Sequence, residues 1–303
     1  AELPRMADAP EGVRLAIAAP RGEAKSTFVS LFFVLWAVLT GRKHYILIIA
    51  DALEQAASLL GAVKDELEFN EALKRDFPGA GKGHVWNVGT VVTPGNVKIQ
   101  ALGAGKRMRG LRHGPHRPDL IVLDDLENDG NVDKPEQRDK LQSWLQKTVL
   151  NLGAADGSMD VVYVGTLLHY DSVLARTLRK PLWKARTFRS ILRWPDRMDL
   201  WDEWESLLSS RGEAEARRFY RQHRVKMEAG AEVSWPASRP LYRLMCLRAE
   251  DREAFDSEQQ NDPLSANEAP FNGCITFWVD RSRDWLLFGA VDPSLGKQGA
   301  GRD

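Results

Sequence analysis

Cysteine is almost absent from this sequence, since Cys246 and Cys274 are the two examples among 303 residues. Their spacing matches no common metal-ligand pattern, and one pair is too few for the disulfide frameworks of small secreted proteins. We therefore expect a protein of a reducing compartment.

A surplus of either charge is also missing, because 42 basic side chains balance 42 acidic ones. No overall field attracts nucleic acid, so contacts with DNA would depend on local basic patches. Residues 176–189 and 211–224 each hold several basic side chains, and Glu213 and Glu215 alternate with those of the second run. That run is at least as well explained by a solvated, salt-bridged helix face.

Long apolar runs are the third absence. Phe28–Leu39 is the longest, and Ser30 interrupts it, so this run is too short to span a bilayer. No basic and apolar leader of the kind found in signal peptides precedes it. From these observations we expect a soluble cytosolic protein. Its 43% of hydrophobic residues is enough for a sizeable core.

The first 190 residues alternate short β-rich runs with helical patterns, which is typical of an α/β fold with a parallel sheet. The expected strands are Val13–Ala18, Tyr45–Ala50, Val97–Ala101, Leu120–Leu123 and Asp160–Val164. The expected helices between them are Lys25–Leu39, Leu53–Asn70 and Pro135–Val149. Residues 79–95 are typical of a hairpin or surface excursion, and residues 104–118 of a mobile basic loop.

After residue 195 the pattern changes to amphipathic helices without strands, at Trp201–Leu208, Ala214–Ala229 and Leu241–Asp256. A new strand is expected at Trp285–Val291, shortly before the sequence stops. We therefore expect a core of residues 1–195, a helical lid or linker subdomain of residues 196–262, and a linker with the incomplete start of another domain in residues 263–303.

The most informative segment lies between the first expected strand and the first long helix. A strand, a small-residue loop, Lys-Ser and a helix form the layout of a phosphate-binding P-loop. In such a loop the backbone N–H groups bind the phosphates of ATP, Lys25 reaches the terminal phosphates and Ser26 is a ligand of Mg²⁺. The candidate nucleotide-binding residues are Pro20, Arg21, Gly22, Glu23, Ala24, Lys25, Ser26 and Thr27. The usual pattern has glycine where this chain has Ala19 and Ala24, so the loop is a variant form.

A second motif is the apolar run Leu120–Leu123 followed by Asp124 and Asp125. A buried parallel strand delivers its last residues to the carboxyl edge of the sheet, where ligands of α/β proteins bind. Asp124 is therefore expected in the Mg²⁺ shell. Either Asp125 or Glu127 would activate the attacking water, and Asp125 is favoured by its position. The alternative is a solvated acidic turn at the start of a helix.

A third strand ends in Gly165-Thr166, where a hydroxyl at the same edge could sense the γ-phosphate. The three motifs in this order resemble the large terminase subunit of tailed bacteriophages, the ATP-driven motor that packages viral DNA into proheads. Further matching segments make the resemblance cover most of the chain. They are Pro20-Arg21-Gly22, Met108-Arg109-Gly110, Phe255–Pro263 and Gly289–Pro293.

The resemblance implies a P-loop ATPase with a small helical lid, followed by an RNase H-like nuclease whose first aspartate, Asp292, binds Mg²⁺ or Mn²⁺. The resemblance assigns Asp292 and at most Asp303 to that metal site, which needs several acidic residues from separate strands, so we expect no nuclease activity from this chain. The implied partners are double-stranded DNA bound without sequence choice, the portal protein, the small terminase subunit and further copies in a ring. The implied location is the host cytoplasm.

Two arginines have candidate roles in catalysis. Arg21 lies inside the loop, where it could brace the γ-phosphate of its own subunit, and Arg109 could complete the site of a neighbouring subunit. The alternatives are a surface-loop arginine for the first and a solvated or DNA-facing arginine for the second. For the whole chain the alternatives are a helicase-like DNA translocase without a capsid role and a catalytically silent P-loop scaffold. The second is motivated by Ala19 and Ala24.

Overall fold

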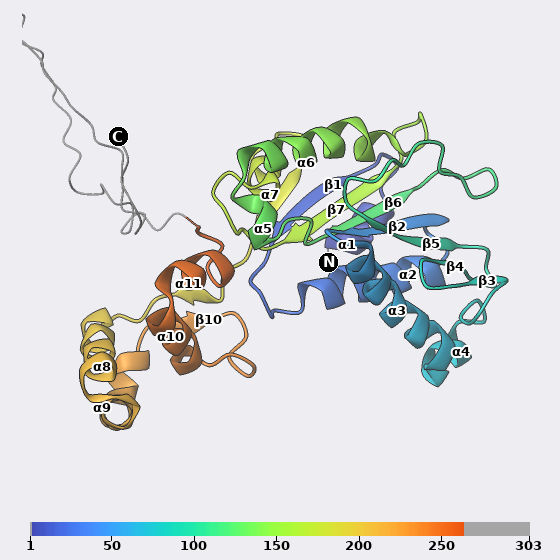
Figure 1. Cartoon of the computed structure of the whole chain (residues 1–303). Helices are drawn as coiled ribbons and strands as arrows, with labels where there is room; N and C mark the ends of the chain where they lie inside the picture. Colours follow the sequence, from blue (N-terminus) through green and yellow to red (C-terminus); the bar gives the residue numbers. More distant parts are fainter. Residues whose placement is uncertain (1, 264–303) are drawn as a thin grey trace, which may run out of the picture. The chain divides into compact units, whose positions relative to one another are not determined.

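The structure is a computed structural model that describes residues 2–263, and these residues belong to one compact unit (Figure 1). The strand expected at Trp285–Val291, together with Asp292 and Asp303, lies outside the described residues. Within residues 2–263, every helix is too short or too polar to cross a bilayer.

An eight-stranded sheet forms the centre of the fold, in the order β3-β4-β5-β2-β6-β7-β1-β8. Its strands are β1 (Arg14–Ala18), β2 (Tyr45–Ala50), β3 (Val85–Trp86), β4 (Thr90–Val92), β5 (Lys98–Gly103), β6 (Leu120–Asp124), β7 (Asp160–Gly165) and β8 (Lys184–Thr187). The strands from β5 to β8 in this order are parallel, and the β3–β4 hairpin adds an antiparallel edge. The predicted α/β class with a largely parallel sheet is confirmed.

The central strands form because their sequences are apolar on both faces. β2, β6 and β7 are buried along their whole length, which fits continuous apolar runs rather than alternating ones. All five strands predicted from the sequence are present, with ends that differ by at most two residues. β8 was not predicted because Lys-Ala-Arg-Thr carries no apolar signal; it is a mostly exposed edge strand beside β1.

Helices cover both faces of this sheet (Figure 1). A π-helix, η1 (Thr27–Phe33), continues into α2 (Val34–Leu39) and packs with α3 (Leu53–Phe69) on one face, and α6 (Pro135–Lys147) and α7 (Val173–Leu178) pack on the other. The pleat of β1 sends Leu15 to the first face and Ala16 and Ala18 to the second. The smaller helices are α1 (Glu2–Ala7), α4 (Glu71–Asp76), α5 (Asp129–Val132) and η2 (Val149–Asn151).

The residues after the sheet have an apolar cluster of their own, with Trp201 and Trp204 fully buried in it. Its helices are α8 (Met198–Arg211), α9 (Glu213–Glu228), α10 (Leu241–Glu250) and α11 (Arg252–Glu258).

Two expectations for these residues were wrong. The single helix expected at Leu241–Asp256 is broken at Asp251, whose carboxylate accepts a hydrogen bond from the Ala254 N–H and so caps the start of α11. The region also contains a short antiparallel pair, β9 (Ile191–Arg193) with β10 (Glu232–Val233).

Candidate functional site

The three sequence motifs meet at one edge of the sheet. β7 lies between β6 and β1, and all three strands are parallel. In their registers Asp124 is opposite Val164, and Gly165 is opposite Ala18. Because parallel strands end at the same edge, the segments that follow β1, β6 and β7 emerge side by side.

The loop after β1 returns to the sheet before it enters the helix. The Ala19 N–H donates to the Gly165 carbonyl at 2.9 Å, and the chain is helical from Lys25 onwards. Gly22 and Ala24 both have a left-handed backbone, with φ of +79° and +56°. Ala24 therefore adopts the conformation that glycine adopts most easily, and it carries the steric cost of a Cβ atom there.

Lys25 connects this loop to the other two motifs. Its Nζ donates to Thr166 Oγ1 at 3.1 Å and lies 3.1 Å from Asp125 Oδ2. Thr166 Oγ1 in turn donates to the Ala19 carbonyl at 3.3 Å. Just 9% of the Lys25 side chain is exposed, so the ammonium group is held between the ends of β6 and β7.

Asp124 lies beneath the loop and is almost fully buried. Ser26 Oγ donates to its Oδ1 at 3.0 Å, and Ser30 Oγ donates to its Oδ2. Burial raises the pKa of Asp124 to about 6, and the charge of Asp125 adds to this shift while the two serine hydrogen bonds oppose it.

Ser26 and Asp124 fit the donor chemistry of Mg²⁺. Both present oxygen atoms, the ligands that this ion prefers. Nowhere in residues 2–263 do three His, Cys, Asp or Glu side chains gather as a metal cage. An ion here would therefore take its other ligands from water and phosphate, which is common for Mg²⁺.

The two candidate bases have different partners. Both oxygens of Glu127 accept hydrogen bonds, at 2.7 Å from the Val173 N–H and 3.1 Å from the Leu174 N–H, and the Tyr163 hydroxyl adds a third. Burial raises the pKa of Glu127, although these hydrogen bonds oppose the shift. Glu127 thus stabilises the first turn of α7, whereas Asp125 contacts Lys25.

A small cavity of about 170 Å³ lies next to these groups. Arg21, Asp125, Glu127 and Thr166 are among the residues that line it. Arg21 is held at the site through Glu258, whose Oε1 lies 2.8 Å from Arg21 Nη1 and whose carbonyl accepts from the Arg21 N–H at 2.9 Å.

Arg109 is not part of this group. It is exposed in the loop of residues 104–118, and none of the described residues pairs with its side chain. Its proposed action on a neighbouring subunit stays a prediction. So does the metal role of Asp292, which lies outside the described residues.

Sequence reasoning missed a group of polar side chains that holds the tip of the loop. Glu23 Oε1 accepts hydrogen bonds from Ser190 Oγ and Ser234 Oγ, each at 2.7 Å. Arg239 Nη1 donates to Gln259 Oε1, which also accepts from Ser190 Oγ at 3.2 Å. These residues are far apart in the sequence and have no periodic pattern. The position of Gln259 inside the Phe255–Pro263 segment was the one signal available.

The same stretch of chain also contacts the end of β7. Asn261 Oδ1 accepts from the Leu167 N–H at 2.9 Å, and its Nδ2 donates to the Phe188 carbonyl at 2.8 Å. Leu167 directly follows Thr166, so α11 and its next residues contact both the loop and the strand that carries the hydroxyl.

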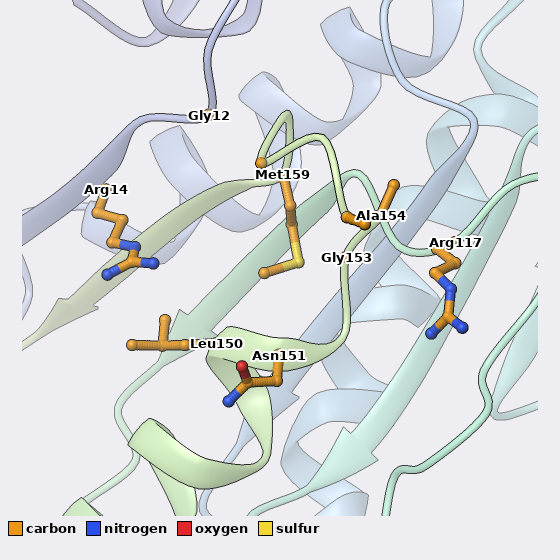
Figure 2. A pocket seen from close by; sticks show the side chains of 10 residues that line it. Gly12, Arg14, Arg117, Leu150, Asn151, Gly153, Ala154 and Met159 are labelled. Atoms are coloured by element: carbon orange, nitrogen blue, oxygen red, sulfur yellow. The ribbon is translucent and has the colours of Figure 1, made fainter.

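A cavity of about 480 Å³ lies elsewhere, at the opposite edge of the sheet (Figure 2). Gly12 and Arg14 border it at the start of β1, Met159 directly before β7, and Arg117 shortly before β6. These are amino-terminal ends of parallel strands, whereas the candidate site lies at the carboxyl ends. This cavity is therefore separate from the residues that the three motifs bring together.

Comparisons with known proteins give structural neighbours but no sequence family. No family model matches the chain, and no curated protein matches it. Among solved structures, the large terminase ATPase domain of Thermus phage P74-26 has a TM-score of 0.44 and 14% identity, covering 86% of this chain and 92% of that one. A mutant of the same domain has a TM-score of 0.42 and 13% identity, covering 86% and 93%. We base the proposed function on the residues of this chain.

Proposed function

We propose that this chain binds and hydrolyses ATP as the motor subunit of a phage large terminase, which moves double-stranded DNA into a prohead. One observation carries the ATPase part of this proposal. Lys25 of the loop contacts both Thr166 and Asp125, while Ser26 contacts Asp124, so three separately recognised motifs form one polar site.

The loop supplies the phosphate-binding groups. The backbone N–H groups of residues 22–27 and the start of the following helix favour anionic phosphates, and Lys25 adds a positive charge. Ser26 and Asp124 would hold Mg²⁺, which neutralises charge on the phosphates. Lys25 Nζ also pairs with Asp125 Oδ2 at 3.1 Å. Binding of phosphate to Lys25 would then free Asp125 to accept a proton from water.

Asp125 is our choice for the group that activates water. Glu127 already uses both oxygens to hold the first turn of α7. Removing Glu127 from this position would leave buried N–H groups without partners, which costs free energy. Thr166 would detect the γ-phosphate through its contact with Lys25, and Arg21 would add positive charge beside it.

Coupling to DNA movement would run through the end of α11 and the segment after it. Glu258 holds Arg21, and Asn261 holds the amide that follows Thr166. A change at the γ-phosphate would therefore reach this segment from two sides. DNA, the portal protein, the small subunit and neighbouring copies remain the proposed partners, and an exposed Arg109 fits a role in a neighbouring site.

A DNA-stimulated ATPase assay tests the proposal. We expect Lys25→Ala and Asp125→Asn each to lower kcat by roughly 100-fold or more, because they remove a phosphate contact and the group that activates water. Lys226→Ala and Asp202→Asn are matched controls at exposed positions and should keep wild-type rates. Equal phosphate release from the wild type and both site variants would reject the ATPase. An active ATPase that fails to package DNA into proheads with its portal and small subunit would favour a helicase-like translocase.

A further inference from the structure

Arg239 lies against the phosphate-binding loop although more than two hundred residues separate them in the sequence. A Cβ atom built on Gly22 would lie 2.0 Å from Arg239 Nη2 and 2.9 Å from its Cζ. The guanidinium group therefore occupies the side of Gly22 on which any other residue would carry its side chain. Gly22 belongs to the group of backbone N–H donors that the proposed function assigns to the phosphates.

The position of Arg239 is fixed by neutral partners. Its Nη1 donates to Gln259 Oε1, and its backbone N–H donates to the Trp235 carbonyl at 2.9 Å. Gln259 is itself buried, with 6% of its surface exposed, and its carbonyl accepts from the Ser190 N–H at 2.8 Å. The guanidinium is therefore held by a buried, neutral amide.

The charge of Arg239 is not balanced. Across residues 2–263, no carboxylate forms an ion pair with it. The carboxylate nearest along the loop, Glu23, accepts hydrogen bonds from Ser190 and Ser234 instead. Arg21, the other arginine at the loop, is already paired with Glu258. Of these two arginines, Arg239 is the one with a free charge and free N–H donors.

We propose that Arg239 contacts the terminal phosphates of the nucleotide bound to its own subunit, and that Gln259 is the positioning residue that holds it there. The inference rests on the proposed ATPase function and adds a further phosphate-contacting cation to Lys25 and Arg21. A guanidinium offers several N–H donors in a planar fork that matches phosphate oxygens. It also makes the residues after the sheet a direct part of the nucleotide site.

Binding of fluorescent ATP and ADP analogues to the full chain, together with kcat and KM, tests this role. We expect Arg239→Ala to weaken binding of the ATP analogue at least tenfold and that of the ADP analogue less. Arg239→Gln retains a donor for Gln259 without the charge and should weaken ATP binding similarly, whereas Arg239→Lys should restore part of the affinity. Arg243→Ala, an exposed position in the first turn of α10, should match the wild type.

The charge-neutral variant separates a phosphate contact from a structural role. If Arg239→Gln binds both nucleotides and turns over ATP within twofold of the wild type, Arg239 is a structural contact and the inference is wrong. Lys25→Ala, measured in parallel, reports on the proposed function itself. Loss of binding in Lys25→Ala with normal binding in Arg239→Gln rejects the arginine alone. Normal nucleotide binding in both variants rejects the site and the inference together.

Gln259→Ala should reproduce part of the loss of ATP binding seen in Arg239→Ala. The melting temperature of the Arg239→Gln protein should equal that of the wild type.

Discussion

Three residues without glycine's freedom have a left-handed backbone around the candidate site. They are Ala24 with φ of 56°, Asp125 with φ of 44° and Asn261 with φ of 50°. Such conformations cost free energy for residues with a Cβ atom, and they persist where the surrounding structure holds them. The Ala24 N–H belongs to the proposed phosphate-binding loop, Asp125 is the proposed group that activates water, and Asn261 holds the amide that follows Thr166. The candidate site therefore stores a small amount of strain.

Replacing Ala24 with glycine should relieve part of that strain. We expect Ala24→Gly to raise the free energy of unfolding by up to about 1 kcal/mol, because glycine adopts this backbone without a steric penalty. Ala19→Gly is the matched control: Ala19 does not have a positive φ, so added freedom of the unfolded chain should lower stability by about 0.5–1 kcal/mol. Urea denaturation measures both. A loss of stability in Ala24→Gly as large as that in Ala19→Gly would contradict the strain at position 24.

At the scale of elements, the link between α11 and the end of β7 depends on one side chain. Asn261 contacts the buried Leu167 amide with its oxygen and the Phe188 carbonyl with its nitrogen. Its left-handed backbone turns the chain after α11 towards both partners. Asparagine tolerates this conformation better than most residues.

Truncation of Asn261 should therefore loosen this link. We expect Asn261→Ala to lower the free energy of unfolding by about 2–4 kcal/mol, because it leaves buried polar groups unpaired and because alanine tolerates the positive φ less well than asparagine. Asn261→Gly should lower the free energy of unfolding less, because it also loses the hydrogen bonds but glycine adopts the positive φ without a steric penalty. Thermal and urea unfolding distinguish the two. Equal losses in both variants would show that the backbone conformation contributes nothing.

The elements of the core could be predicted because their signals are local. The apolar runs of β2, β6 and β7 fix buried strands, and parallel strands necessarily bring their carboxyl ends to one edge. The features that the sequence did not predict depend on competing or weak local signals, or on contacts between residues far apart in the chain. Asp251 interrupts an apolar helical pattern with a cap, β8 has no apolar side, and the contact of Arg239 with Gly22 joins residues that no local pattern relates.

At the scale of the whole molecule, the proposed nucleotide site takes its residues from two parts of one compact unit. The sheet and its edge provide the loop, Asp124, Asp125 and Thr166, and the residues after the sheet provide Glu258 and Arg239. Arg109 is exposed and away from these groups, so its proposed role needs a second copy of the chain.

Subunit mixing tests that role. Arg109→Ala subunits keep an intact loop, and Lys25→Ala subunits keep the arginine, so a mixture in assembled motors should recover ATPase activity that neither variant has alone. Subunits that carry both substitutions are the matched control and should restore nothing when mixed with Arg109→Ala. If the first mixture stays as inactive as the second, action of Arg109 on a neighbouring subunit is rejected.

The contact between Gly22 and Arg239 also constrains how this protein can change over generations. A side chain at position 22 would have to displace the guanidinium, and loss of the arginine would remove one reason for glycine at that position. We expect the two positions to covary among related chains, so that arginine at 239 occurs with glycine at 22. Chains with another residue at 22 should either lack the arginine or hold it through a hydrogen bond to a residue other than Gln259. Selection on the loop would then act through a residue that no P-loop pattern includes.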